Sequence, residues 1–208
     1  MIKIENVKAC GWEPAIRGMR NSWNSWEKSD SYFSVVPCIA ANDLELMMRL
    51  AKSGSSHAKY RRMIIVYCDV TAPLYWWKEM DTYKVGTVCN SCSTMHTISK
   101  KEFTLYDFSH EHLLDSTKET LKIICEILNK SRVMFLETKD KQYWWQMIQL
   151  LPTSYNQKRT LMLNYEILSN IYHSRKNHKL DEWIEFCKWI EGLPYSELIT
   201  LEDPNETD

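Results

Sequence analysis

Glycine and proline are scarce in this chain, which has 5 Gly and 6 Pro among its 208 residues. Folds made of many short strands need frequent turn residues, so this composition disfavours a loop-rich all-β protein. Long apolar runs are missing as well, because no stretch approaches the ~20 residues that cross a bilayer. The N-terminus also lacks the apolar segment of a signal peptide, so we expect a cytoplasmic protein without a membrane segment.

Charge of one sign is not in excess, since the formal net charge is −1. The chain therefore lacks the positive field that attracts nucleic acids or anionic membranes, and we expect neither as a partner. The 7 cysteines are odd in number and scattered, which is typical of reduced thiols in the cytosol. Aromatic residues are abundant instead, and the 9 Trp and 11 Tyr indicate large contact surfaces or stacking pockets.

Residues 71–96 combine aromatic and polar side chains more densely than the rest of the chain. Trp76 and Trp77 lie beside several acids and lysines, and a run of hydroxyl, amide and thiol side chains follows from Thr87 to Thr94. Aromatic faces stack on flat ligands and a few placed polar groups orient them, so the segment suits a ligand pocket. A buried strand edge followed by a polar loop explains the same composition, and both interpretations stay open.

The pattern of apolar residues predicts a helix-rich α+β protein. No repeat, low-complexity linker or domain boundary is visible, so we expect a single domain over residues 1–208 with an acidic tail at 201–208. Strands are expected at 2–4 and at 61–70, around Ile64 and Ile65. Helices are expected at 15–23, 43–52, 111–130, 142–151, 155–174 and 180–191. The second of these begins with the capping-box pair Asn42 and Glu45.

The expected helix at 155–174 leads to a second candidate site. Asn164 and Arg175 are eleven residues apart, which would place them within ~20° of each other on one helix face. An arginine fork beside an amide suits a planar ligand with carbonyl groups or a phosphate. Asn170 would point in another direction on the same helix. A solvated helix face without any ligand remains the alternative.

Metal, redox and nucleophilic chemistry have little support in the sequence. The Cys89-Asn-Ser-Cys92 motif has no second ligand pair at the spacing of a zinc site. A thioredoxin-like motif would open a helix, whereas Gly86 and its neighbours indicate a loop. Ser93 and His96 do not define a catalytic dyad, and neither a GxSxG elbow nor a glycine-rich phosphate loop occurs. We therefore expect no bound metal, and these motifs identify no catalytic dyad.

The order of these features resembles that of the flavin-dependent thymidylate synthases, over about residues 14–189. A Ser-Ser-His sequence ending at His57 precedes the expected strand at 61–70, as a Glu-His pair does in that family. Residues 90–96, Asn-Ser-Cys-Ser-Thr-Met-His, resemble the second half of the family signature RHRxxSxNExSxRY. A Leu-Pro pair at 151–152 is followed at the family's spacing by Asn164, Asn170 and Arg175.

Several arginines of that signature are absent here. Residues 79–85 read EMDTYKV, so Lys84 is the only basic residue where the signature has two arginines and a histidine. Met95 replaces the last signature arginine. The family has a further arginine just before the Leu-Pro pair, and this chain has Ile148 at about that position. Arginines of this kind hold phosphate groups through charge-assisted bonds worth roughly 1.5–3 kcal/mol each. Either the ligand differs or other cations replace them, with Arg61, Arg62, Lys84 and Arg159 as candidates.

The resemblance implies an α+β fold with a mixed sheet flanked by long helices, assembled as a homotetramer with pockets at subunit interfaces. It implies FAD-dependent transfer of a one-carbon unit to C5 of a uracil nucleotide, most simply dUMP, with methylenetetrahydrofolate as carbon donor and NAD(P)H as reductant. A non-catalytic nucleotide-binding or regulatory relative, or a flavoenzyme for another pyrimidine nucleotide, is the alternative. The resemblance assigns His57, Lys84, Asn164 and Asn170 to the cofactor, and Trp77, Asn90, Ser93 and Arg175 to the substrate.

Overall fold

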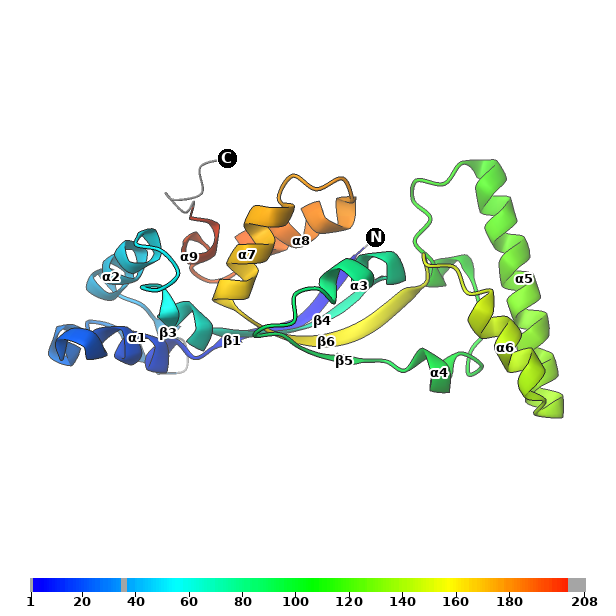
Figure 1. Cartoon of the computed structure of the whole chain (residues 1–208), viewed down its shortest axis with the longest axis horizontal. Coiled ribbons are helices and arrows are strands. Elements are labelled where there is room, and N and C mark those ends of the chain that lie inside the picture. Colours follow the sequence, from blue (N-terminus) through cyan, green and yellow to red (C-terminus); the bar gives the residue numbers. More distant parts are fainter. Residues whose placement is uncertain (1, 35–36, 202–208) are drawn as a thin grey trace. The chain divides into compact units, whose positions relative to one another are not determined.

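The computed structural model describes residues 2–34 and 37–201, which form two compact units (Figure 1). Unit 1 comprises Met1–Ile4, Asp69–Thr82 and Asn90–Thr160, and unit 2 comprises Glu5–Cys68, Tyr83–Cys89 and Leu161–Asp208. Within the described residues, no helix is both long and apolar enough to cross a membrane. The single domain expected from the sequence remains a prediction, and positions 202–208 of the expected acidic tail lie outside the described residues.

Four strands form the main sheet, and each of them contains a boundary between the two units. The strands are arranged antiparallel in the order β1 (Lys3–Cys10), β4 (Ile65–Pro73), β6 (Asn156–Asn164) and β5 (Val88–Ser91). Alternate residues of β4, from Val66 to Ala72, are almost fully buried, as expected for a strand with one face on a core. The predicted α+β fold is confirmed, with an antiparallel sheet where a mixed one was expected.

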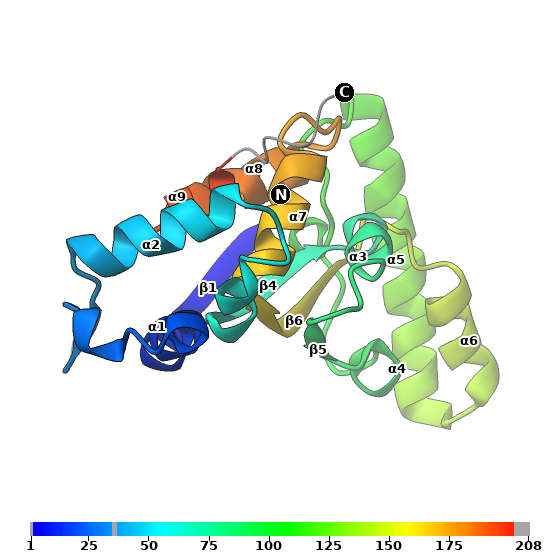
Figure 2. The same ribbon diagram turned by 60° about the vertical axis from the view of Figure 1, so that its left-hand side comes forward.

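Unit 2 is mainly helical. Helix α7 packs against α8 and α9, and α2 also contacts α9 (Figure 2). An edge-to-face contact of 5.2 Å joins the rings of Trp12 and Tyr165, and the Ser169 hydroxyl donates to the carbonyl of Ile199 at 2.7 Å. These contacts fix α7, which ends at Arg175, within unit 2. The helices are α1 (Trp12–Arg20), α2 (Ala41–Lys52), α7 (Tyr165–Arg175), α8 (Asp181–Glu191) and α9 (Glu197–Thr200). Shorter elements are η1 (Asn21–Trp23), η2 (Trp26–Lys28), η3 (Lys59–Met63), β2 (Tyr32–Phe33) and β3 (Pro37–Cys38).

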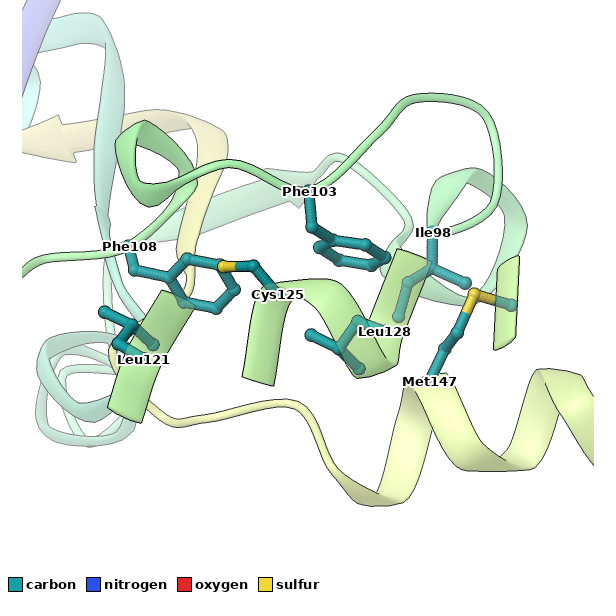
Figure 3. Close-up of a cluster of buried hydrophobic side chains, with 7 residues drawn as sticks. All are labelled: Ile98, Phe103, Phe108, Leu121, Cys125, Leu128 and Met147. Carbon is teal, nitrogen blue, oxygen red and sulfur yellow. The ribbon is translucent and has the colours of Figure 1, made fainter. Parts of the chain in front are cut away.

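Unit 1 contains a long helical hairpin, α5 (Asp115–Thr138) and α6 (Lys141–Gln149), with shorter elements α3 (Leu74–Met80), α4 (Thr94–Thr97) and η4 (Leu105–Asp107). The hairpin turns sharply because Lys139 adopts a left-handed conformation, with φ of 59°, and the Asp140 carboxylate caps α6 by accepting from the Gln142 amide at 2.8 Å. Figure 3 shows the apolar cluster that this hairpin covers. Its members are Ile98, Phe103, Phe108, Leu121, Cys125, Leu128 and Met147.

The capping box predicted for α2 is wrong. The helix begins at Ala41, two residues earlier than the pair required, and its N-cap residue Ala40 has no side chain that can cap it. The carboxylate of Asp30 performs this role instead, because it accepts hydrogen bonds from the amides of Asn42 at 2.9 Å and Asp43 at 3.1 Å. A cap supplied from twelve residues away leaves no local signal in the sequence.

The helix predicted at 155–174 is also wrong in its first half, where β6 occupies 156–164 and only α7 is helical. Leu161 and Leu163 are buried on β6 and alternate with the less buried Thr160 and Met162, which is the period of a strand. The strand predicted at 61–70 begins later, at Ile65, after the turn η3. The predictions for the helices now called α1, α6 and α8 agree with the structure to within a few residues at their ends, whereas α5 runs on to Thr138, well beyond the predicted end at 130.

Candidate functional site

The predicted site residues are distributed over both units. Unit 1 contains Trp77, Asn90 and Ser93. Unit 2 contains His57, Lys84, Asn164, Asn170 and Arg175.

Arg175 is held between two aromatic rings in unit 2. Its Nε donates a hydrogen bond to the hydroxyl of Tyr83 at 3.0 Å. Its guanidinium carbon lies 4.9 Å from the ring centre of Trp183 and 5.7 Å from that of Tyr83. Trp183 itself is completely buried, so the guanidinium rests on a fixed surface. The cation–π contacts and the hydrogen bond restrict the side chain, and a guanidinium held in one orientation suits the recognition of a carbonyl or phosphate group.

The sequence did not identify Tyr83 or Trp183 as partners of Arg175. Tyr83 lies 92 residues earlier in the chain, in the aromatic and polar segment 71–96, next to the predicted cofactor residue Lys84. Lys84 is exposed in the same loop. The segment 79–85 contains both Tyr83 and Lys84. The hydrogen bond between Tyr83 and Arg175 of α7 depends on tertiary structure, so the local sequence does not reveal it.

Asn164 has a structural role that the sequence did not reveal. It is the N-cap of α7, where its side-chain oxygen accepts from the amide of Ile167 at 2.9 Å. It therefore does not share a helix face with Arg175, and the separation of eleven positions places the two roughly 16 Å apart along the axis. The predicted alignment of these two residues is wrong. Asn170 lies between them on α7, with an exposed side chain.

The loop that carries Tyr83 and Lys84 packs closely against this cap. Gly86 has a φ of +76°, and a Cβ placed on it would lie 2.7 Å from the Asn164 side-chain nitrogen and 3.3 Å from a carbon of Ile167. Only glycine combines that backbone conformation with so close an approach. Gly86 thus sets the position of the loop relative to α7.

We expect Gly86→Ala to destabilise the fold by at least about 1–2 kcal/mol, since a left-handed non-glycine residue already costs that much before the steric overlap is counted. Urea unfolding measures the loss. Gly54→Ala is a matched control, because Gly54 has a φ of +89° but nothing lies within 4 Å of an added Cβ. Equal losses in the two variants would show that the contact with Asn164 has no energetic weight.

A wide cleft of about 1520 Å³ lies within unit 2, and the predicted cofactor residue His57 lines it. Trp23, with 88% of its side chain exposed, and the buried Tyr60 provide aromatic surface there. Arg49 and Lys59 add positive charge. The cleft exceeds the ~300–1000 Å³ of typical small-molecule pockets, and its mixture of rings and cations fits an anionic ligand with flat rings.

A buried ion pair supports the segment that lines this cleft. Arg20 and Asp43 are almost fully buried, and Nε of the arginine donates to the carboxylate at 2.6 Å. The same carboxylate accepts from the Ser29 hydroxyl at 2.7 Å and from the Ser31 amide at 3.1 Å. Burial raises the pKa of Asp43, but the hydrogen bonds from Ser31, Ser29 and Arg20 outweigh burial and hold the pKa below its ordinary value.

This lowered pKa gives a prediction for acid stability. A carboxyl whose pKa is lower in the folded state contributes stability that is complete above its unfolded pKa of ~3.9 and is lost as the pH falls through the folded value. We expect the free energy of unfolding of the wild type to fall more steeply than that of Asp43→Asn between neutral pH and about pH 3. Urea unfolding at several pH values measures both slopes, and parallel slopes would contradict the assignment.

Trp77 is buried in unit 1 with only 1% of its surface exposed. Its indole N–H donates to the Gln157 carbonyl at 3.0 Å, and the guanidinium of Arg159 lies 4.3 Å from its ring centre. Arg159 also donates to Asp81 at 2.7 Å. The aromatic face that the sequence suggested for a ligand is therefore packed against the protein's own cation in this chain.

The cations proposed as substitutes for the missing arginines differ in their surroundings. Arg62 is paired with Glu166, at 2.9 Å between Nη2 and Oε1, and Arg61 is buried in unit 2. Arg159 is bound to Asp81. Lys84 is exposed and forms no salt bridge with a residue that the structure describes. Phosphate binding by these four cations thus rests mainly on Lys84.

The signature-like segment in unit 1 is open to solvent. Asn90 is exposed on β5, and Ser93 is the N-cap residue of the short helix α4, although its hydroxyl makes no capping bond. Cys89 and Cys92 are exposed, and neither forms a disulfide within the part of the chain that the structure describes. No cluster of three or more His, Cys, Asp or Glu side chains suited to a metal occurs among the residues that the structure describes.

No protein-family model and no curated protein sequence matches the chain. Thymidylate synthase X (ThyX) from Helicobacter pylori, solved with FAD and dUMP, matches 96% of this chain and 98% of its own, with a TM-score of 0.71 and 16% identity. Another complex of the H. pylori enzyme with FAD and dUMP covers 94% and 98%, with a TM-score of 0.67 and 17% identity. The UMP/dUMP methylase PolB from Streptomyces cacaoi, bound with 5-Br dUMP, covers 92% and 89%, with a TM-score of 0.61 and 12% identity. The chain therefore has the fold of the flavin-dependent thymidylate synthases.

Proposed function

We propose that this protein transfers a one-carbon unit to C5 of a uracil nucleotide, with dUMP as the simplest substrate, in a flavin-dependent reaction. The observation that carries the proposal is the fixed guanidinium of Arg175, held by Tyr83 and Trp183. Arg175 is also the residue that the sequence resemblance assigns to the nucleotide base. Its fork of donors suits the carbonyl groups of uracil. The resemblance also assigns Trp77, Asn90 and Ser93 of unit 1 to the substrate, and these three residues remain proposed contacts.

The residues of unit 2 fit an FAD cofactor. The large cleft next to His57 combines an exposed indole with cationic side chains, as a dinucleotide with flat rings and a diphosphate needs. His57, Lys84 and Asn170 are exposed and remain our proposed cofactor contacts, with Asn164 positioning the loop that carries Lys84. The flavin supplies the hydride when bound. The protein's own contribution is then to orient the nucleotide and to exclude water, without a protein nucleophile.

The missing signature arginines favour two narrower alternatives. A non-catalytic nucleotide-binding or regulatory relative would retain the Arg175 contact but not the flavin chemistry. A flavoenzyme for another pyrimidine nucleotide is favoured by the likeness to PolB, which is described as acting on both UMP and dUMP. Comparing UMP with dUMP as substrates separates this second alternative from the leading proposal.

The test is product formation by the purified protein with FAD, NADPH, methylenetetrahydrofolate and dUMP, analysed by mass spectrometry. We expect dTMP to form in a strictly flavin-dependent manner. Product from UMP alone would favour the second alternative. Binding of dUMP without any product would favour the non-catalytic relative, and the absence of both binding and product would refute the proposal. The cytoplasm remains our expected location.

We also propose that the chain assembles as a homotetramer. Ile123, Ile127 and Met134 of α5 are spaced so that they form one stripe about 40° wide, and they are 55%, 42% and 36% exposed in the single chain. An exposed apolar helix face of this kind is typical of a protein interface.

Light scattering should therefore give a mass near four chains, and Ile127→Lys should lower it because a lysine at the stripe cannot be buried without a partner charge. Glu126→Lys is the control, since Glu126 is a neighbouring exposed position outside the stripe. A monodisperse monomer in the wild type, or identical masses for both variants, would contradict the proposal.

A further inference from the structure

Arg61, in the turn η3 of unit 2, is buried with part of its guanidinium unpartnered. Only 8% of the residue's surface is exposed. Its Nε and Nη2 atoms have almost no solvent-accessible surface, and neither has a hydrogen-bond partner among the residues that the structure describes. An arginine stays protonated when it is buried, and a buried charge without hydrogen-bond partners is strongly unfavourable. These two N–H groups therefore require an acceptor that the described part of the chain does not supply.

The two unpartnered atoms form one edge of the guanidinium. Nε and Nη2 each direct an N–H to the same side, which is the arrangement that binds two oxygens of a carboxylate or a phosphate at once. The next residue, Arg62, binds Glu166 with these same two atoms. Its Nη2 donates to Oε1 at 2.9 Å, and its Nε donates to Oε2. The edge of Arg61 therefore has the geometry of an oxyanion site.

Arg61 lies one side chain away from the large cleft of unit 2. Its neighbours Lys59, Tyr60 and Met63 line that cleft. Burial raises the pKa of Tyr60 to about 12, while the charge of Arg61 and a hydrogen bond from Arg61 oppose this rise, so the two side chains are in contact. The Tyr60 hydroxyl donates to the carbonyl of Met47 at 2.8 Å, which holds the ring in place. Tyr60 thus contacts both the cleft and the guanidinium.

We propose that the Nε–Nη2 edge of Arg61 binds a small free oxyanion, either a carboxylate or a tetrahedral anion such as phosphate or sulfate. Two oxygens of the anion accept from the two N–H groups and neutralise the buried charge. The anion enters when Tyr60 moves aside, because the edge has almost no accessible surface in this conformation. The site is separate from the proposed FAD and nucleotide contacts, whose cations are Lys84 and Arg175, and it goes beyond the proposed function.

Thermal unfolding of the full chain, without flavin or nucleotide, tests the proposal. The probes are sodium phosphate, sulfate, formate and acetate, each compared with sodium chloride at equal ionic strength. An anion that binds only the folded state raises the Tm, and we expect a rise of about 3–6 °C at ten times the Kd. A response to phosphate and sulfate alone would identify a tetrahedral anion, and a response to formate and acetate alone would identify a carboxylate. Both results support the proposal.

Variants of the two adjacent arginines separate this site from general salt effects. Arg61→Met should abolish the rise in Tm, because it removes the fork of donors. Arg62→Met is the matched control and should respond as the wild type does, since the fork of Arg62 is already bound to Glu166. This control also corrects for phosphate and sulfate, which stabilise folded proteins in general. Arg61→Lys keeps the charge without the fork, so the anion concentration at half response should rise about tenfold.

The proposal is overturned if no oxyanion raises the Tm of the wild type above its value in chloride, or if Arg61→Met responds as strongly as Arg62→Met. In chloride alone, Arg61→Met should melt no lower than the wild type, because it removes a buried charge. A clearly lower Tm would show that the guanidinium is already satisfied, which also overturns the proposal. If Arg61→Met does not fold, Arg61→Lys replaces it in the same comparison. None of these measurements involves dUMP or FAD, so their failure leaves the proposed function standing.

Discussion

Asp43→Ala should destabilise the protein by about 3–5 kcal/mol, a large fraction of the 5–15 kcal/mol that a domain of this kind has in total. The variant leaves the guanidinium of Arg20 buried without its carboxylate, and it removes the acceptor for Ser29 and Ser31. Uncompensated buried charge is costly because the interior screens it poorly. Urea unfolding followed by circular dichroism measures the loss.

Glu45→Ala is the matched control for this prediction. Glu45 is on the same helix and lines the same cleft, but its carboxylate is exposed. We expect a change within ~0.5 kcal/mol, as for most surface substitutions. If Asp43→Ala and Glu45→Ala destabilise equally, the buried pair does not support the cleft. A variant of Asp43 that folds should also bind FAD more weakly, because residues 20–31 form one side of the cleft.

Arg175→Ala should weaken dUMP binding by roughly 1.5–3 kcal/mol, about tenfold to a hundredfold. The variant loses a charge-assisted hydrogen bond to the base, from a guanidinium that lies 4.9 Å from the ring centre of Trp183. Calorimetric titration of the wild type and the variant measures the difference. Because the guanidinium covers Trp183, we also expect a loss of stability near 1 kcal/mol, more than a fully solvated arginine would cause.

Two further variants separate binding from packing. Arg175→Lys keeps a positive charge near the rings but removes the planar fork, so stability should largely return while dUMP affinity stays low. Tyr83→Phe keeps the ring and removes only the hydroxyl that accepts from Arg175, so affinity should fall by less than in Arg175→Ala. Full dUMP affinity in Arg175→Ala would make this arginine a purely structural residue.

Sequence and structure agree where the signal is local. The helices α6 and α8 follow their local apolar patterns, and the polar segment around Lys84 forms the loop whose Gly86 approaches Asn164 and Ile167. The pairing of Tyr83 and Trp183 with that arginine was missed because it joins residues from three parts of the chain. Such contacts are products of tertiary packing and leave no periodic pattern.

The wrong assignments have the same physical origin. Leu161 and Leu163 fit either a helix or a strand over a short window, and neighbouring strands of the sheet decided the outcome. Asn164 consequently became a cap instead of a residue on a helix face. The cap of α2 comes from Asp30, whose distance in sequence hides it from any local motif.

The visible absorption spectrum of the purified protein with FAD, before and after addition of dUMP, is the most direct test of the proposed flavin-dependent reaction. If flavin and nucleotide bind in one site, the protein should retain flavin through gel filtration, and dUMP should shift the flavin absorption bands. The dUMP concentration that gives half of this shift should rise at least tenfold in Arg175→Ala. Retained flavin whose spectrum does not respond to dUMP or UMP, or no retained flavin at all, would contradict the proposed function.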